Sequence, residues 1–148
     1  MKRLIGCALC WASAAGVAQA LPVIITAGGT AFDGGPAFEM RLGDVVIGTG
    51  QVAEPIPEGG QEFTFEVDDD LFANNPQLTL ALTNDRFIAD VGDRNLQIYS
   101  VQIGELQLLP AGFSLRVPDM GAQPFTGRLS ADSWIAIADA PEGGWLSE

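Results

Sequence analysis

The sequence of 148 residues contains no histidine, and both of its two cysteines lie within the first ten residues. Without histidine, the Ser-His-Asp and Cys-His pairs of nucleophilic catalysis are excluded, and so are histidine-ligated zinc sites. Basic residues are also scarce, since 7 Lys and Arg stand against 19 Asp and Glu, which gives a formal net charge of −12. This balance argues against binding to nucleic acid and against docking on anionic lipid, because both need clustered positive charge.

The first twenty residues have the features of a secretory signal peptide. Residues 1–3 are basic, the stretch that follows is apolar, and residues 18–20 form the small-x-small pattern that signal peptidase cuts. The apolar stretch is shorter than the ~20 residues of a membrane span, and no stop-transfer charges follow it. We therefore expect residues 1–20 to be removed and the protein to be secreted or periplasmic, without membrane insertion.

Removal of this segment leaves a chain without cysteine or lysine. Its five arginines and 19 acidic residues give a net charge of 5 − 19 = −14. An exported domain of this size without disulfides needs a large core or a bound metal for its stability. The acid excess makes cations the natural partner.

Short runs of alternating apolar and polar residues, separated by turn signals every 8–12 residues, predict an all-β fold. Each run has one apolar face, as in Phe63, Phe65 and Val67. The pattern is typical of an antiparallel β-sandwich of jelly-roll type. We expect residues 21–109 to form the sandwich and residues 110–148 to add strands or a tail to it. The expected strands are residues 21–26, 37–42, 45–47, 61–67, 78–83, 96–103, 106–109, 113–117 and 134–137; residues 68–77 read as turns and residues 84–94 as a polar loop.

This polar loop carries three acids, Asp85, Asp90 and Asp93, between two apolar strands. Because the ends of such a loop lie close together, Asp85 and Asp93 can face one point. Ca²⁺ takes six to eight hard oxygen ligands, and without His or Cys it is a better candidate than zinc, copper or iron. Gly92 would allow an unusual backbone angle that turns a carbonyl inward. The alternative is a solvated acidic loop whose side chains cap backbone groups.

The loop also carries a family resemblance. The string LTND at residues 82–85, followed by GDRNL at residues 92–96 and an alternating strand that ends in Gly104, resembles the calcium-dependent, xylan-binding carbohydrate-binding modules of families sixty and thirty-six. The strings VIITAGGT at residues 23–30 and FEMRLGDVVIG at residues 38–48 are also similar, so the resemblance covers residues 21–109. One departure is Tyr99, which stands where the strand of the family often has Asp.

The resemblance implies a jelly-roll sandwich with Ca²⁺ in the loop, where vicinal sugar hydroxyls fill open positions on the ion. Asp85 and Asp93 match the acidic ligands, and the carbonyl of Gly92 is a third candidate. Asp90 is added from the chemistry of the loop alone.

Three further residues of the matching motif, Asn84, Arg94 and Asn95, are candidate ligand-binding residues. For Arg94 two roles are open, because its guanidinium can either neutralise the acids around the metal or hydrogen-bond to sugar.

The function expected is therefore that of a secreted, non-catalytic, Ca²⁺-dependent module that binds a xylan-like polysaccharide. The alternative is a secreted β-sandwich whose Ca²⁺ is purely structural and which acts in surface assembly or adhesion. A glycosidase is not expected, because no convincing pair of facing carboxylates is present. Nothing in the sequence indicates the oligomeric state.

Overall fold

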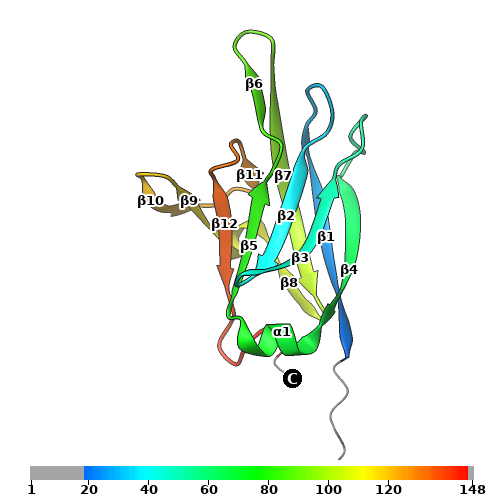
Figure 1. The fold of residues 1–148 in the computed structure, drawn as a ribbon, viewed down its shortest axis with the longest axis vertical. Helices are drawn as coiled ribbons and strands as arrows, with labels where there is room; N and C mark the ends of the chain where they lie inside the picture. The colour runs from blue at the N-terminus through cyan, green and yellow to red at the C-terminus, as the bar shows by residue number, and fades with distance from the viewer. Residues whose placement is uncertain (1–18, 147–148) are drawn as a thin grey trace, which may run out of the picture.

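The computed structural model describes residues 19–146, and two antiparallel sheets account for nearly all of its secondary structure (Figure 1). The predicted antiparallel β-sandwich is confirmed. The signal peptide expected at residues 1–20 lies outside the described residues except for its last two.

The first sheet has the order β11 (Arg128–Leu129), β7 (Gly92–Ile103), β1 (Ala20–Thr30), β4 (Gln61–Asp68), and both β6 (Arg86–Ile88) and β8 (Leu106–Leu108) pair with β7. The second has the order β10 (Gly121–Pro124), β9 (Ser114–Val117), β12 (Ile135–Asp139), β5 (Gln77–Leu82), β2 (Ala37–Leu42), β3 (Val45–Gln51).

The core lies between the two sheets and is built from alternate residues of each strand. Leu78, Leu80 and Leu82 of β5 are buried, and Val67 of β4 is buried opposite them. Full burial of one such aliphatic side chain stabilises the fold by roughly 1.5–3 kcal/mol. The ring of Phe38 contacts the half-buried Phe63 edge-on at 5.0 Å between centroids, which joins the two sheets.

A short helix, α1 (Asp69–Asn74), occupies the segment that the sequence predicts as turns. Asp69 and Asp70 lie in its first turn, where negative charge interacts favourably with the helix dipole. Phe72 is buried and anchors the helix on the sandwich, and this tertiary contact is absent from the local pattern. A single 3₁₀ turn, η1 (Pro110–Gly112), follows β8. Within residues 19–146, no helix is long and apolar enough to cross a membrane.

The chain after residue 109 contributes strands to both sheets. On the first sheet, Leu129 of β11 pairs with Leu96 of β7; on the second, Ile135 of β12 pairs with Ala81 of β5. The turn between β11 and β12 therefore crosses from one sheet to the other, beside the ends of β5 and β6 (Figure 1). The strands β10 and β11 were not expected, because segments of two to four residues are too short to show an alternating pattern.

Residues 86–94 form an ordered hairpin where the sequence predicts a polar loop. Strands β6 and β7 pair through Arg86 with Arg94, Phe87 with Asp93 and Ile88 with Gly92. Figure 1 shows this hairpin projecting beyond the rest of the sandwich, at the end opposite α1.

Candidate functional site

The acidic motif lies at the base of the projecting hairpin. Asp93 and Asn95 are alternate residues of β7 and therefore share one face of the strand. Phe87, the cross-strand partner of Asp93, is exposed on β6. Asp85 directly precedes β6, so the hairpin register brings it back to the level of Asn95. The prediction that the two ends of this segment lie close together is confirmed, because the ends of a hairpin are neighbours.

Asn95 and Asp93 form the most constrained polar contact at this base. The Asn95 Nδ2 donates to Asp93 Oδ2 at 2.7 Å. Asn95 is only 3% exposed, and its buried Oδ1 has no hydrogen-bond partner among residues 19–146. A buried oxygen without a hydrogen-bond partner destabilises the folded state by about 1–3 kcal/mol. Such an oxygen therefore marks a position suited to a cation or to a hydrogen-bond donor.

The Asp85 carboxyl has a raised pKa. The main cause is partial loss of solvent around the group, followed by the negative charges of Asp132 and then Asp93; a backbone hydrogen bond from Arg86 and the charge of Arg94 act in the opposite direction. Asp85 remains an exposed residue, so the desolvation is partial. An excess of negative charge at this base is the condition that a bound cation relieves.

Two residues near this site, Arg128 and Asp132, were missed by the sequence reasoning. The Arg128 Nη2 lies 3.6 Å from Asp93 Oδ2, and Asp132 belongs to the turn between β11 and β12. No local pattern marks them, because they lie more than thirty positions beyond the motif and reach it only through strand pairing.

Arg94 is buried, with 8% of its surface exposed, and its guanidinium is occupied by backbone carbonyls. It donates to the oxygens of Gly34 at 3.1 Å, Asn84 at 2.7 Å and Phe32 at 2.7 Å, and also to Asp33. These bonds tie the loop between β1 and β2 to the base of the hairpin.

Asn84 makes a second link of the same kind. Its Oδ1 accepts from the Ala37 amide at 2.7 Å, and its Nδ2 donates to the Gly35 carbonyl at 3.0 Å. The amide group thus joins the end of β5 to the start of β2 and positions the strand that leads to Asp85.

The expectation that Gly92 adopts an unusual backbone angle is wrong. Gly92 is not among the residues with positive φ, whereas Asp90 has φ 60° at the tip of the hairpin. Glycine is needed at position 92 because there is no room for a side chain: a Cβ would lie 2.3 Å from Cδ2 of the Phe32 ring. Asp90 is exposed in the turn that the Val91 amide closes on the Ile88 carbonyl at 3.1 Å.

The donor chemistry at the hairpin base fits a hard cation. Within residues 19–146, no three acidic, His or Cys side chains are grouped closely enough to hold a metal by themselves. Asp85 and Asp93 offer two carboxylates, and Asn95 offers an unpaired amide oxygen. Ca²⁺ needs six to eight oxygens, so such a set leaves positions for backbone carbonyls, water or a ligand.

A polar hollow of about 230 Å³ adjoins this base on the outer face of the first sheet. Its lining includes Asn95, Gln97 and Tyr99 of β7, Thr30 of β1 and Arg128 of β11. Asn95 belongs to both the hollow and the acidic base, so the two are contiguous.

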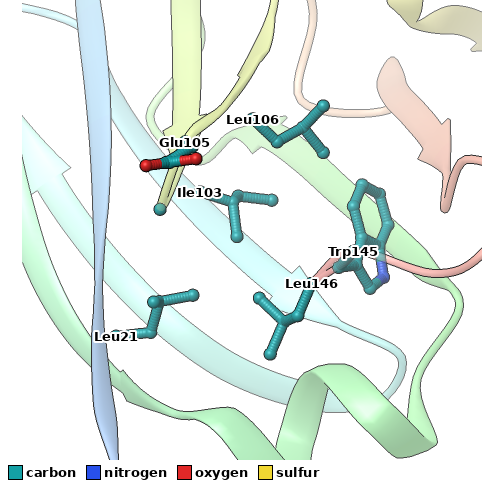
Figure 2. Close-up of a pocket in the computed structure, with 7 residues that line it drawn as sticks. Leu21, Ile103, Glu105, Leu106, Trp145 and Leu146 are labelled. Carbon is teal, nitrogen blue, oxygen red and sulfur yellow. The ribbon is translucent and has the colours of Figure 1, made fainter. Parts of the chain in front are cut away.

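A larger hollow, of about 470 Å³, is lined mainly by apolar side chains and the rim residue Glu105. Figure 2 shows Leu21, Ile103, Leu106, Trp145 and Leu146 converging on it. It contains none of the acidic motif and offers few groups that could bind a hydroxylated ligand.

Comparison with known proteins gives a family match and a fold match. The model of the CBM60 family, described as a Ca-dependent, xylan-binding carbohydrate-binding module, matches residues 22–114. No curated protein matches the chain. The structure is similar to the selenomethionine form of vCBM60, from work that links two families of calcium-dependent carbohydrate-binding modules by circular permutation. The TM-score is 0.57 at 14% sequence identity, covering 80% of this chain and 91% of that one.

Proposed function

Because the chain belongs to the CBM60 family of Ca-dependent, xylan-binding carbohydrate-binding modules, we propose that its cation site lies at the base of the β6–β7 hairpin. The protein is a non-catalytic module that binds xylan in a calcium-dependent manner. Asp85 and Asp93 supply carboxylate oxygens to the cation, and Asn95 supplies its Oδ1. The observation that carries this assignment is the buried, unpartnered Oδ1 of Asn95 beside the Asp93 carboxylate.

The residues around this set have supporting roles. Arg94 and Asn84 hold the neighbouring loops through backbone groups and contact no ligand, since their polar atoms are already occupied. Gly92 makes room for Phe32, and Asp90 lies in the turn at the far tip of the hairpin. The ligand set therefore omits Asp90 and Gly92, which the sequence had suggested.

Access to solvent favours a cation that contacts sugar over one that is purely structural. Asp85 is exposed, and the hairpin projects from the sandwich (Figure 1). A polar hollow opens beside Asn95. When bound, Ca²⁺ supplies positions that two vicinal sugar hydroxyls can fill in place of water. The protein's own part is to fix the carboxylates on a paired hairpin and to leave one side of them open.

The experiment is affinity electrophoresis on xylan with Ca²⁺ and with EDTA, for the wild type, Asp85→Asn and Asp93→Asn. Both variants should lose retention while keeping the circular dichroism spectrum of the sandwich. Asp44→Asn, at the exposed turn between β2 and β3, is the matched control and should be retained like the wild type. Undiminished retention of both site variants would refute the assignment.

We propose further that residues 1–20 are a signal peptide and that the protein is secreted or periplasmic, since modules of this family bind extracellular polysaccharide. Mass spectrometry of the exported protein should give an N-terminus at Leu21.

We also propose that residues 21–109 and 110–148 fold as one domain. This is supported by the pairing of β12 with β5 and of β11 with β7. A chain that stops at residue 109 should accordingly fail to fold.

A further inference from the structure

One face of β7 presents a continuous row of polar side chains. Leu96 and Ile98 are fully buried and point into the core, so alternation places Asp93, Asn95 and Gln97 on the outer face. The row begins at the proposed cation site and runs along the strand into the polar hollow.

A β-bulge extends this row to Tyr99. In the pairing of β1 with β7, Thr26 pairs with Ser100 and Ala27 pairs with Ile98, so Tyr99 has no partner. A bulge redirects the side chain of the extra residue and is frequent beside binding sites. Tyr99 is consequently 43% exposed, on the outer face of the sheet.

Gly28 of β1 leaves bare backbone beside Tyr99. It pairs with Gln97, whose side chain lies on the outer face, so a side chain at position 28 would lie over that same face. A Cβ on Gly28 would lie 3.0 Å from Cε2 of Tyr99, so the ring leans over bare backbone on this side. The ring also lies close to Gly60, where a Cβ would be 2.9 Å from Cδ2 and Cε2 of Tyr99.

The hydrogen-bonding groups of the hollow have capacity for a ligand. Within the described part of the chain, Gln97 Nε2 makes only two hydrogen bonds, both long at 3.4 Å, to the carbonyls of Ile98 and Thr126. Arg128 of β11 pairs with Gln97 of β7 and is exposed, whereas the next residue, Leu129, is fully buried in the core. An amide and a guanidinium beside an exposed aromatic ring form a combination suited to a sugar, which has hydroxyls at its edge and C–H groups on its face.

We propose that this hollow is a second sugar subsite, and that the polysaccharide lies along β7 from Asp93 toward Tyr99. A sugar unit farther along the polysaccharide packs on the Tyr99 ring, and its hydroxyls bond to Gln97 and Arg128. From Asp93 to Tyr99 the strand advances by six steps of ~3.3 Å, or about 20 Å, which suits a linear chain more than a single sugar. This inference rests on the proposed cation site, since that site fixes one end of the chain.

The test is isothermal titration of xylohexaose in the presence of Ca²⁺, with Ca²⁺ affinity measured separately in the absence of sugar. Tyr99→Ala should weaken xylohexaose binding about tenfold, as expected for loss of an aromatic platform, and leave Ca²⁺ affinity unchanged. Tyr99→Phe should bind almost as the wild type. Gln97→Ala should weaken binding about threefold, whereas Gln102→Ala, an exposed glutamine of the same strand, should have no effect.

Wild-type xylohexaose affinity in both Tyr99→Ala and Gln97→Ala would overturn the subsite. If Tyr99→Ala melts at a lower temperature than the wild type, Gln97→Ala decides alone, because it removes a half-buried amide group and leaves the bulge intact. Failure of the wild type to bind Ca²⁺ would instead refute the cation site itself. Loss of xylohexaose binding with intact Ca²⁺ binding supports the subsite specifically.

Discussion

Arg128 Nη2 lies 3.6 Å from Asp93 Oδ2, so the site contains an internal positive charge beside one of its proposed ligands. Arg128 comes from β11, beyond the residues that match the family model, and reaches Asp93 through the pairing of β11 with β7. Both side chains are partly exposed, so solvent screens their attraction and the pair is weak. A weak pair is readily exchanged for a divalent cation.

Replacing Arg128 by Gln should therefore raise the Ca²⁺ affinity, because the carboxylate of Asp93 no longer has a competing cation. The expected gain is about two- to fivefold, which corresponds to an exposed ion pair. Calcium titration without sugar, at low ionic strength, measures it. Arg116→Gln, an exposed arginine on β9, serves as the control for the change in net charge. A lower affinity in Arg128→Gln would contradict the competition.

Replacing Arg94 by Ala should destabilise the fold by about 3 kcal/mol or more, since four backbone carbonyls lose their donor. Arg94→Lys should restore little, because an ammonium cannot reproduce the fork of the guanidinium. Urea unfolding gives the free energy of each variant, and the exposed Arg86→Ala is the comparison. A variant that loses sugar binding at unchanged stability would assign Arg94 to the ligand instead.

Replacing Gly92 by Ala should cost about 1–3 kcal/mol, because the new methyl group overlaps the Phe32 ring. That ring also lies 5.8 Å from Cζ of Arg86, which limits its movement. The double variant Gly92→Ala, Phe32→Ala should recover part of the loss relative to the sum of the single changes. Thermal unfolding of the four proteins tests this coupling, and strict additivity would argue against the contact.

Calcium should stabilise the folded protein by mass action. At a Ca²⁺ concentration one hundred times Kd, the gain is about 2.7 kcal/mol, enough to raise Tm by roughly 10 °C. Differential scanning calorimetry with Ca²⁺, with Mg²⁺ and with EDTA measures the shift. Asp93→Asn should lose it, and an unchanged wild-type Tm at millimolar Ca²⁺ would exclude a metal site.

Calcium affinity should fall on mild acidification, at a pH above the ordinary aspartate range. The pKa of Asp85 is raised from 3.8 by partial desolvation and by the charges of Asp132 and Asp93, so protons compete with the cation earlier. Without calcium, the contribution of Asp85 to folding stability changes with pH in the opposite direction. The folded state binds this proton more tightly than the unfolded chain, so the contribution of Asp85 to stability decreases as pH rises through the raised pKa.

Calcium titrations between pH 7 and pH 4 test this dependence. Asp132→Asn removes one of the negative charges, so it should lower the pKa of Asp85 and move the loss of affinity to a lower pH. A shift toward higher pH in this variant would contradict the electrostatic account.

The periodic strands were predictable because their burial is encoded locally. The alternation of Leu78, Leu80 and Leu82 gave β5 to within a residue, and the spacing of the LTND and GDRNL strings placed Asp85 and Asp93 at the two ends of one segment. The paired strands within that segment and the helix at residues 69–74 were not predicted. Strand β6 has only three residues, too few to show an alternating pattern. The helix depends on contacts with distant residues, as the burial of Phe72 illustrates.

The sequence by itself determined an all-β chain, rich in acids and without histidine, with a motif chemically limited to hard cations. Only the tertiary structure decided which polar groups of that motif are free. Arg94 and Asn84 bind backbone carbonyls and amides of other loops, whereas Asn95 keeps an oxygen without a partner. The structure alone also brought Arg128, Asp132 and Tyr99 toward the site. The reason is physical, because strand register and a bulge fix these positions through hydrogen bonds between segments that are far apart in the chain.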